Sequence, residues 1–156
     1  MFAIVPPILK PAIAKALAET PNLRRTRVIH ISTDHVYSGR SFSKESEVKP
    51  VNQYALSKLK GEGFIETVNG TVLRTNFIGK SGNPKHPSLT DWSAQQLKIG
   101  RTISAFNNVY FSALHYSSLC ENIERVVKHP ATGVFNLGCV GRYTKADVII
   151  KIASLT

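Results

Sequence analysis

The chain has 156 residues, of which 42% are hydrophobic and 19% are charged. This length and composition indicate one globular domain with a buried core, and they argue against a disordered chain. The formal net charge of +10 favours an anionic partner. However, the densest basic cluster, Arg24 to Arg27, is short, and the chain has neither zinc-finger spacing nor an aromatic RNA-binding pattern. We therefore rank nucleic acid below an anionic small molecule such as a dinucleotide or a sugar nucleotide.

The sequence offers no sign of a membrane, a secretory pathway or a metal site. Every apolar run is shorter than the ~18 residues that a membrane-spanning helix needs. The stretch from Met1 to Leu9 is apolar but lacks a basic leader and contains two prolines, unlike a signal peptide. Cys120 and Cys139 lack CxxC spacing, and the five histidines give no metal-ligand spacing. We expect two reduced, buried cysteines in a cytoplasmic protein without a metal.

The predicted elements alternate between helix and strand. In chain order they are a helix over 8–18, a strand over 27–33, a helix from the cap Asn52 to about Val68, a strand over 71–76, a helix from Ser88 to about Ile99, a strand over 102–106, a helix over 116–128, a strand over 133–137 and a helix from Thr144 to the end. Gly70 and Gly100 supply stop signals for two of the helices. This alternation predicts an α/β fold, with a mostly parallel sheet and helices on both faces.

Tyr54 and Lys58 are the residues that point most directly to chemistry. They lie four positions apart on the predicted 52–68 helix, so their side chains project from the same face. An ammonium close to a phenol favours the phenolate, which helps a tyrosine to exchange a proton with an alcohol or carbonyl oxygen. Thr33 ends the preceding strand, where its hydroxyl can hold the same oxygen. Ligands of open parallel sheets bind at that end of the strands.

A tyrosine and a lysine at this spacing are common by chance. Three conditions favour function here: a strand ending in hydroxyls upstream, a helix start just before the tyrosine, and a strand directly after the helix. Other polar residues have a plainer interpretation. We expect His30 to be a core histidine with its hydrogen bonds satisfied and Asn136 to be structural, whereas Asp34 serves either the site or its own turn, and Trp92 either stacks on a ligand or packs under a loop.

Several different motifs follow one another along the chain. Residues 28–39 form a strand that ends in Ser-Thr-Asp, and residues 50–62 read Pro-x-Asn-x-Tyr-Ala-x-Ser-Lys-x-x-Gly-Glu. Further motifs cover 73–79, 88–92, 108–111 and 133–138. Together they resemble the extended short-chain dehydrogenase/reductases, and within that superfamily most closely the dTDP-4-dehydrorhamnose reductase family. The resemblance covers essentially the whole chain and implies a Rossmann-type fold.

The resemblance also implies an activity and a set of site residues. It implies reduction of a 4-keto-6-deoxy sugar nucleotide with NADP or NAD, in polysaccharide biosynthesis. Tyr54 would be the catalytic acid/base, Lys58 its partner and a ligand of the nicotinamide ribose, and Thr33 the polarising hydroxyl. The implied cofactor contacts are Ser32, Lys58, Asn76, Phe77 and Ile78. The implied substrate contacts are Asp34, Ser88, Trp92 and Tyr110.

The chain departs from the family's pattern at its N-terminal side. The family opens with a Gly-x-x-Gly-x-x-Gly turn that cradles the cofactor pyrophosphate, whereas the first glycine here is Gly39, after the catalytic strand. Ala55 also stands where glycine is common. We expect one partial domain, with the C-terminal part of the Rossmann fold over about 1–80 and the substrate-binding region over about 81–156.

This departure carries further expectations. We expect the four N-terminal strands to be missing, so that the inner edge of the 27–33 strand is unpaired. We also expect weak NAD(P) binding and no activity by this chain alone, with an N-terminal fragment or a second copy as a partner. Two other functions stay open: a regulatory protein of the same fold, or a sugar-nucleotide epimerase or dehydratase. We rank the dehydratase lower because only one acidic residue, Asp34, follows Thr33.

Overall fold

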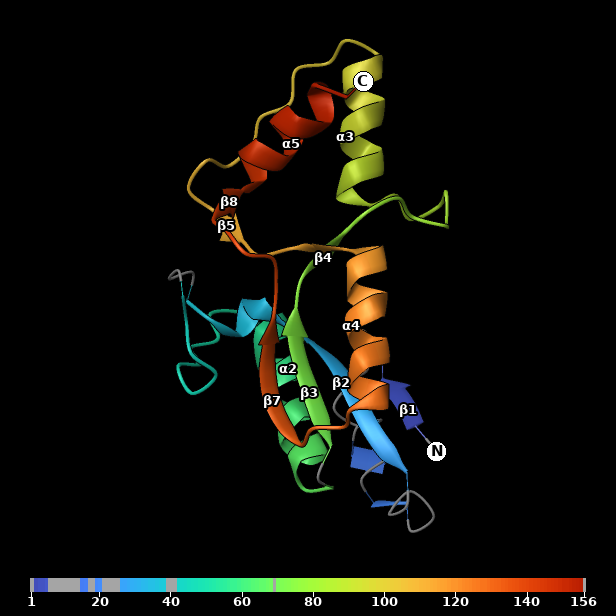
Figure 1. Cartoon of the computed structure of the whole chain (residues 1–156). Coiled ribbons are helices and arrows are strands. Elements are labelled where there is room, and N and C mark those ends of the chain that lie inside the picture. Colours follow the sequence, from blue (N-terminus) through green and yellow to red (C-terminus); the bar gives the residue numbers. More distant parts are fainter. Residues whose placement is uncertain are drawn as a thin grey trace. The chain divides into compact units, whose positions relative to one another are not determined.

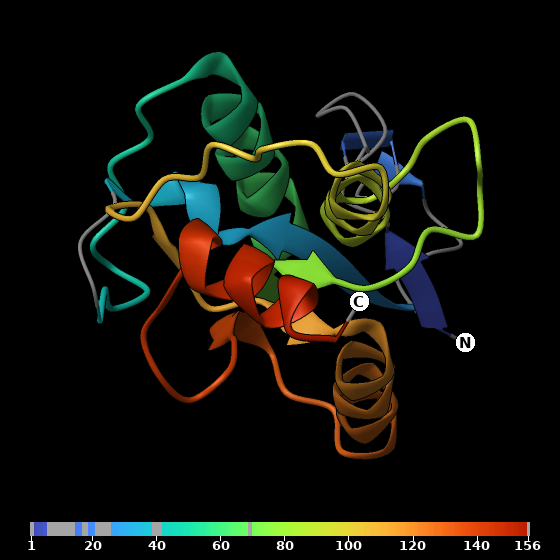
Figure 2. The same cartoon turned by 90° about the horizontal axis from the view of Figure 1, so that it is seen from above.

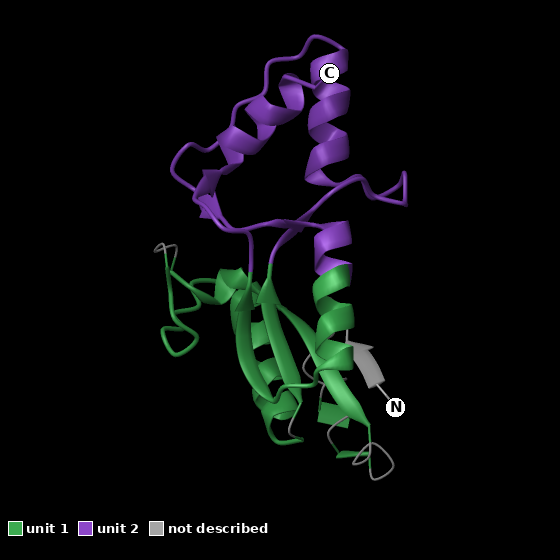
Figure 3. Ribbon diagram, in the orientation of Figure 1, with its two compact units in different colours: residues 1–75, 121–137 green, residues 76–120, 138–156 purple. Residues whose placement is uncertain are grey.

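The computed structural model describes residues 2–5, 15–16, 19–20, 26–38, 42–68 and 70–155. The chain divides into two compact units that interleave along the sequence, shown in different colours in Figure 3. Unit 1 takes residues 1–75 and 121–137, and unit 2 takes residues 76–120 and 138–156. Each unit is thus made of two stretches of the sequence, which alternate with the stretches of the other unit. The expected division near residue 80 stays a prediction.

Unit 1 is built on a four-stranded parallel sheet (Figure 1). Its strands, in spatial order, are β1 (Phe2–Val5), β2 (Arg27–Thr33), β3 (Thr71–Thr75) and β7 (Gly133–Leu137). All residues of β3 and six of the seven in β2 are buried. Such continuous burial is typical of parallel strands that helices cover on both faces. The predicted parallel α/β fold is confirmed.

The first strand corrects one expectation. β1 pairs with β2 in parallel, in a register that runs from Phe2 with Arg27 to Val5 with His30. The prediction that this edge of β2 is unpaired is therefore wrong. A segment of four apolar residues is near the lower limit of strand length, so it displays no period by which the sequence could identify it. Most of the helix predicted over 8–18 lies outside the described residues, although Lys15 and Ala16 are helical.

Two helices cover opposite faces of this sheet (Figure 2): α2 (Gln53–Glu66) and, from residue 121 on, α4 (Tyr116–Lys128). The buried cluster on the α2 side is Val28, Ile65 and Val72, and the cluster on the α4 side is Ile29, Ile31 and Leu73. Successive side chains of a strand point to opposite faces. The α2 face of β2 therefore carries Val28, His30 and Ser32 in a row.

Helix α2 begins and ends where the sequence predicts. The side chain of Asn52 accepts a hydrogen bond from the Ala55 N–H at 2.8 Å, which caps the first turn. At the other end, the Gly70 N–H donates to the Ile65 carbonyl at 3.0 Å. A Cβ at position 70 would lie 2.5 Å from Cγ2 of Ile65, so the chain needs a glycine where it turns back toward β3.

Unit 2 contains two complete helices, the start of α4 up to Cys120, and two short strand pairs. The helices are α3 (Leu89–Lys98) and α5 (Lys145–Ala153), and they pack against each other. β4 (Phe77–Ile78) pairs with β6 (Leu114–His115) in parallel, and β5 (Tyr110–Phe111) pairs with β8 (Tyr143–Thr144) in antiparallel. Both helices begin with a capping box, Ser88 with Asp91 and Thr144 with Asp147. Gly100 follows α3 with φ of +71°, which agrees with its predicted role as a stop signal.

Two local predictions for the second half of the chain are wrong. Residues 101–106 belong to neither a helix nor a strand. The Phe106 carbonyl instead accepts from the Ala146 N–H at 3.1 Å, so this backbone group serves the start of α5 rather than a sheet ladder. Both cysteines are free, but neither is buried as expected, because Cys120 is exposed and Cys139 is only partly buried. It lies one turn before Ile123, where the packing of α4 against the sheet begins.

Candidate active site

Tyr54 and Lys58 occupy the first two turns of α2, directly after the Asn52 cap. The Nζ atom of Lys58 lies 5.7 Å from the centroid of the Tyr54 ring. Lys58 is 3% exposed, whereas Tyr54 is 49% exposed. The shared helix face that their spacing predicts is confirmed, and it combines a buried cation with an accessible phenol.

The C-terminal end of β2 reaches the same place. A short 3-10 turn, η2 (Asp34–Val36), follows the strand, and the Thr33 hydroxyl accepts from the His35 N–H at 3.2 Å. The His35 ring packs edge-on against the Tyr54 ring, with centroids 5.8 Å apart and an interplanar angle of 81°. Thr33 and Tyr54 are thus linked through His35, which the sequence did not single out.

Asp34 has a structural part in this turn. Its carbonyl accepts from the Tyr37 N–H at 3.1 Å, and its carboxylate lies 3.9 Å from Nε2 of His35. The turn role that we considered is therefore present. A role in substrate binding stays a prediction.

Lys58 and His30 are both buried polar residues of unit 1. Among the residues that the structure describes, Nζ of Lys58 and both ring nitrogens of His30 have no hydrogen-bond partner. Burial lowers the pKa of Lys58, and the charge of Glu62 opposes that shift. Burial and the charge of Lys58 lower the pKa of His30 to about 4, so its ring is neutral at pH 7. His30 is a core residue as predicted, but its expected hydrogen bonds are not present among the described residues.

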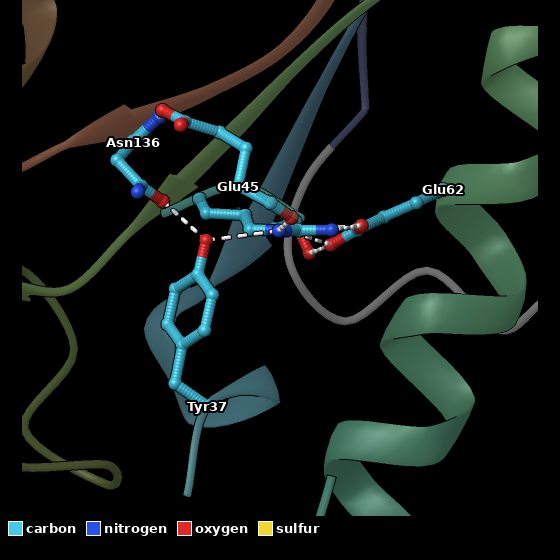
Figure 4. A network of polar contacts seen from close by, with 6 residues as sticks. Tyr37, Glu45, Glu62 and Asn136 are labelled. Atoms are coloured by element: carbon cyan, nitrogen blue, oxygen red, sulfur yellow. Dashed lines mark hydrogen bonds and ion pairs between the residues drawn. The ribbon is translucent and has the colours of Figure 1, made fainter. Parts of the chain in front are cut away.

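Glu62 lies one turn after Lys58 and holds a buried ion pair (Figure 4). Its carboxylate accepts from Nη2 of Arg74 at 2.7 Å and from Nε at 3.1 Å, and it also accepts from the Ser32 hydroxyl. Burial alone would lower the pKa of Arg74, but the hydrogen bonds and charges of Glu62 and Tyr37 raise it overall. Arg74 is therefore the hydrogen-bonded ion-pair partner of Glu62, whose charge also favours the ammonium of Lys58.

The same network reaches the loop between η2 and α2 (Figure 4). Nη1 of Arg74 donates to the Tyr37 hydroxyl at 2.8 Å and to the Glu45 carbonyl at 2.7 Å. Tyr37 donates to Oδ1 of Asn136 at 2.5 Å, and the Asn136 N–H donates to the Glu45 carboxylate at 3.0 Å. The hydrogen bond from the Asn136 backbone lowers the pKa of Glu45. Asn136 makes structural contacts, as predicted, and joins the loop to β7.

Sequence reasoning missed most of this network, although two of its members carry a signal. Arg74 is a charged residue inside a strand predicted to be buried, and such a residue almost always has a charged partner. Glu62 is the best candidate for the partner of Arg74, because it stands four residues after Lys58 on the buried face of the helix. Glu45 lies in an irregular loop, and nothing in the sequence marks it.

The other predicted site residues belong to unit 2. Asn76 follows β3, Phe77 and Ile78 form β4, Ser88 caps α3, Trp92 lies on α3, and Tyr110 lies on β5.

The Ser88 hydroxyl donates to Oδ2 of Asp91 at 2.8 Å and accepts from the Asp91 N–H at 3.1 Å. Hydrogen bonds from Ser81 and Ser88 lower the pKa of Asp91. Trp92 is exposed, and the guanidinium of Arg142 lies 4.0 Å from the Tyr110 ring centroid.

Among the described residues, no group of three or more His, Cys, Asp or Glu side chains gathers where it could hold a metal ion. Within the same part of the chain, no helix is long and apolar enough to cross a membrane.

Residues 9–154 match the protein family described as the RmlD substrate binding domain. The chain belongs to this family. Among curated relatives, a dTDP-4-keto-6-deoxy-D-glucose reductase of Streptomyces niveus is 27% identical over 142 residues, which are 86% of this chain and 48% of that protein. The chain thus spans about half the length of the relatives it matches. The predicted resemblance to the dTDP-4-dehydrorhamnose reductase family is confirmed.

Solved structures of RmlD relatives share the fold. A hypothetical dTDP-4-dehydrorhamnose reductase from Sulfolobus tokodaii is 25% identical with a TM-score of 0.80, over 92% of this chain and 51% of that one. A dTDP-4-dehydrorhamnose reductase from Bacillus anthracis, solved in complex with NADP, is 24% identical with a TM-score of 0.77, over 91% and 51%. The predicted Rossmann-type α/β fold is confirmed.

Proposed function

We propose that this chain carries the proton-transfer residues of an NAD(P)H-dependent reductase that acts on a 4-keto-6-deoxy sugar nucleotide. One observation carries the proposal: the buried ammonium of Lys58, which has no hydrogen-bond partner among the described residues, lies 5.7 Å from the ring of an accessible tyrosine, Tyr54, beside the end of β2. The names of the curated relatives support the class of substrate.

The proton step falls to Tyr54. Its hydroxyl donates a proton to the substrate oxygen as the carbonyl carbon is reduced, which leaves a phenolate. The Lys58 ammonium favours that phenolate, because a buried cation attracts a nearby negative charge strongly. Thr33 accepts from the backbone of His35 and can still donate its own proton to the same substrate oxygen. Two donors then hold the oxygen on which negative charge develops.

The residues present fit the nicotinamide end of a dinucleotide. An ammonium has three donors, and Nζ of Lys58 has no partner among the described residues, so ribose hydroxyls are suitable acceptors. A bound nicotinamide nucleotide supplies the hydride. Asn76, Phe77 and Ile78 stay proposed cofactor contacts on the family resemblance alone. Ser32 already donates its proton to Glu62, so it would contribute only its oxygen lone pairs.

The pyrophosphate end lacks its usual cradle. The chain contains no Gly-x-x-Gly-x-x-Gly segment, whose N–H groups would bind the phosphates. We propose that the chain alone binds NAD(P) weakly and needs a complementing N-terminal segment for activity. Calorimetric titration of the purified chain with NADPH tests the first point, and a micromolar dissociation constant would contradict it.

Activity is tested by co-producing the chain with the N-terminal half of a related reductase and following NADPH oxidation with the keto-sugar nucleotide. Tyr54→Phe should lower the rate roughly 100- to 10,000-fold. The matched control is Tyr143→Phe, since Tyr143 is 48% exposed but lies on β8, in unit 2. Equal rates for the two variants would overturn the proposal. Sugar epimerisation without net NADPH oxidation would favour an epimerase, and binding without turnover would favour a regulatory protein.

A further inference from the structure

An open groove lies on the α4 side of the sheet, between helix α4 and strands β3 and β7. Its volume is about 530 Å³, and all of its lining residues belong to unit 1. Sites for small molecules in proteins usually have volumes of roughly 300–1,000 Å³. Thr33, Tyr54 and Lys58 are not among the lining residues, so the groove is separate from the proton-transfer residues proposed above.

The floor of the groove is apolar. Leu73 pairs with Phe135 in the ladder between β3 and β7, and the Leu73 side chain packs in the cluster on the α4 side. Residues in register share a face of the sheet, so Phe135 lies on that side as well. Its ring is nevertheless 38% exposed. Because helices normally bury both faces of a parallel sheet, this ring marks a part of β7 that α4 leaves uncovered.

One face of α4 forms the wall of the groove and carries a cation. The residues of this face follow one another at spacings of three and four, which place them on one side of the helix: Asn122, Arg125, Val126 and His129. Among the described residues, Arg125 is exposed and forms no ion pair. The neighbouring carboxylate of Glu124 is engaged by Lys128 instead, at 2.6 Å. Within the described chain, no acidic residue lines the groove.

We propose that this groove binds a small aromatic carboxylate, with its ring on Phe135 and its carboxylate on the guanidinium of Arg125. Aromatic rings attract each other in offset or edge-on arrangements, and the exposed Phe135 ring offers such a contact. A guanidinium presents two parallel N–H donors that match the two oxygens of a carboxylate. The net charge of +10 also favours the approach of an anion.

The same two contacts distinguish this ligand from its neighbours in chemistry. A neutral aromatic molecule keeps the contact with Phe135 but loses the ion pair. An aliphatic acid keeps the ion pair but loses the contact between rings. An aromatic amine meets the like charge of Arg125, with no lining carboxylate to offset it. The groove should therefore prefer the aromatic acid over all three.

The test uses the full chain without cofactor or substrate, so its result does not depend on the function proposed above. Indole-3-acetate is titrated into ¹⁵N-labelled protein, and saturable shifts are expected at the amides of Leu73, Val126 and Phe135. The dissociation constant should be about 1 mM or lower, as is typical of a ligand of this size. Indole-3-acetamide, octanoate and tryptamine should each bind about threefold more weakly or worse. Equal affinities for the four compounds, or no saturable shift, would overturn the proposal.

Two variants of α4 separate the ion pair from general electrostatic attraction. Arg125→Gln should weaken the binding of indole-3-acetate about threefold or more. Lys128→Gln removes the same charge from the same helix, but Lys128 does not line the groove. Its effect should be much smaller, because salt screens a charge that makes no direct contact. Equal effects of the two variants would overturn the proposal. Shifts at the same amides that depend on protein concentration without the probe would also overturn it, because a second copy would then fill the groove.

Discussion

Nη2 of Arg74 donates to the Glu62 carboxylate at 2.7 Å, and the two side chains are only 4% and 3% exposed. This ion pair joins β3 to α2, the helix that carries Tyr54 and Lys58. The position of the candidate acid/base pair against the sheet therefore depends on a contact between residues 12 positions apart in the sequence.

Breaking this pair should destabilise the chain strongly. Glu62→Gln leaves the Arg74 guanidinium buried without a counter-charge, and such a loss costs about 3–5 kcal/mol. Urea unfolding followed by circular dichroism measures it. The matched control is Glu124→Gln, which breaks the 2.6 Å pair with Lys128 whose side chains are 62% and 64% exposed. That change should cost less than about 1 kcal/mol, and similar losses in both variants would contradict the prediction.

The free energy of unfolding should decrease as the pH is lowered, over a pH range that the pKa of His30 sets. Its pKa is about 4 in the folded chain against an ordinary value of 6.5, so between these values only the unfolded chain binds the proton. The stabilisation is complete above pH 6.5 and is lost as the pH falls through 4, by about 3 kcal/mol. Unfolding free energies at pH 7.5, 6, 5 and 4 measure this slope.

Carboxylates provide the contrast for that experiment. Their hydrogen bonds with Ser81 and Ser88, and with Thr144, lower the pKa values of Asp91 and Asp147 respectively below 3.8. Their contribution is present above pH 3.8 and is lost only as the pH falls further. His30→Leu should remove the pH dependence of the unfolding free energy between pH 6.5 and 4, and should leave the loss at lower pH unchanged. A wild-type chain with constant stability over that range would refute the buried neutral histidine.

A methyl group at position 79 should disturb unit 2. Gly79 has φ of +146°, and a Cβ there would lie 2.5 Å from Cδ2 of Tyr116. Gly79→Ala should therefore cost at least about 1 kcal/mol. The matched control is Gly82→Ala in the same loop, where a Cβ would meet nothing within 4 Å. Thermal unfolding of both variants measures the difference, and equal midpoints would show that the loop relaxes freely.

The first turn of α2 should depend on its cap. Asn52→Ala removes the acceptor of the Ala55 N–H and should cost about 1 kcal/mol, whereas Asn52→Asp preserves it. Because the Ala55 N–H loses its hydrogen-bond acceptor, hydrogen exchange at the Ala55 amide should become faster in the alanine variant. Tyr54 lies in the same helical turn. Asn108→Ala, at an exposed position outside the helices, serves as control and should change stability by less than about 0.5 kcal/mol. Unchanged exchange at Ala55 would contradict the role of the cap.

The sequence by itself determined the elements that short-range physics controls. Helix α4 over Tyr116–Lys128 and strand β7 over Gly133–Leu137 have the predicted bounds. The Asn52 and Ser88 caps are also where the sequence predicts them. The common face of Tyr54 and Lys58 follows from helical periodicity alone. Caps, turns and periods involve residues within about four positions of each other, so a single sequence carries their signal.

Only the tertiary structure decided which distant groups meet. It paired β1 with β2, joined Glu62 to Arg74, and buried the His30 ring where none of the described residues offers it a hydrogen bond. Residues 102–106 form no strand in the structure, since the Phe106 carbonyl accepts a hydrogen bond from the start of α5 instead. Such contacts depend on which backbone and side-chain groups become neighbours after folding. Local propensity does not encode that choice, because every unpaired group must be satisfied by whatever the completed packing places beside it.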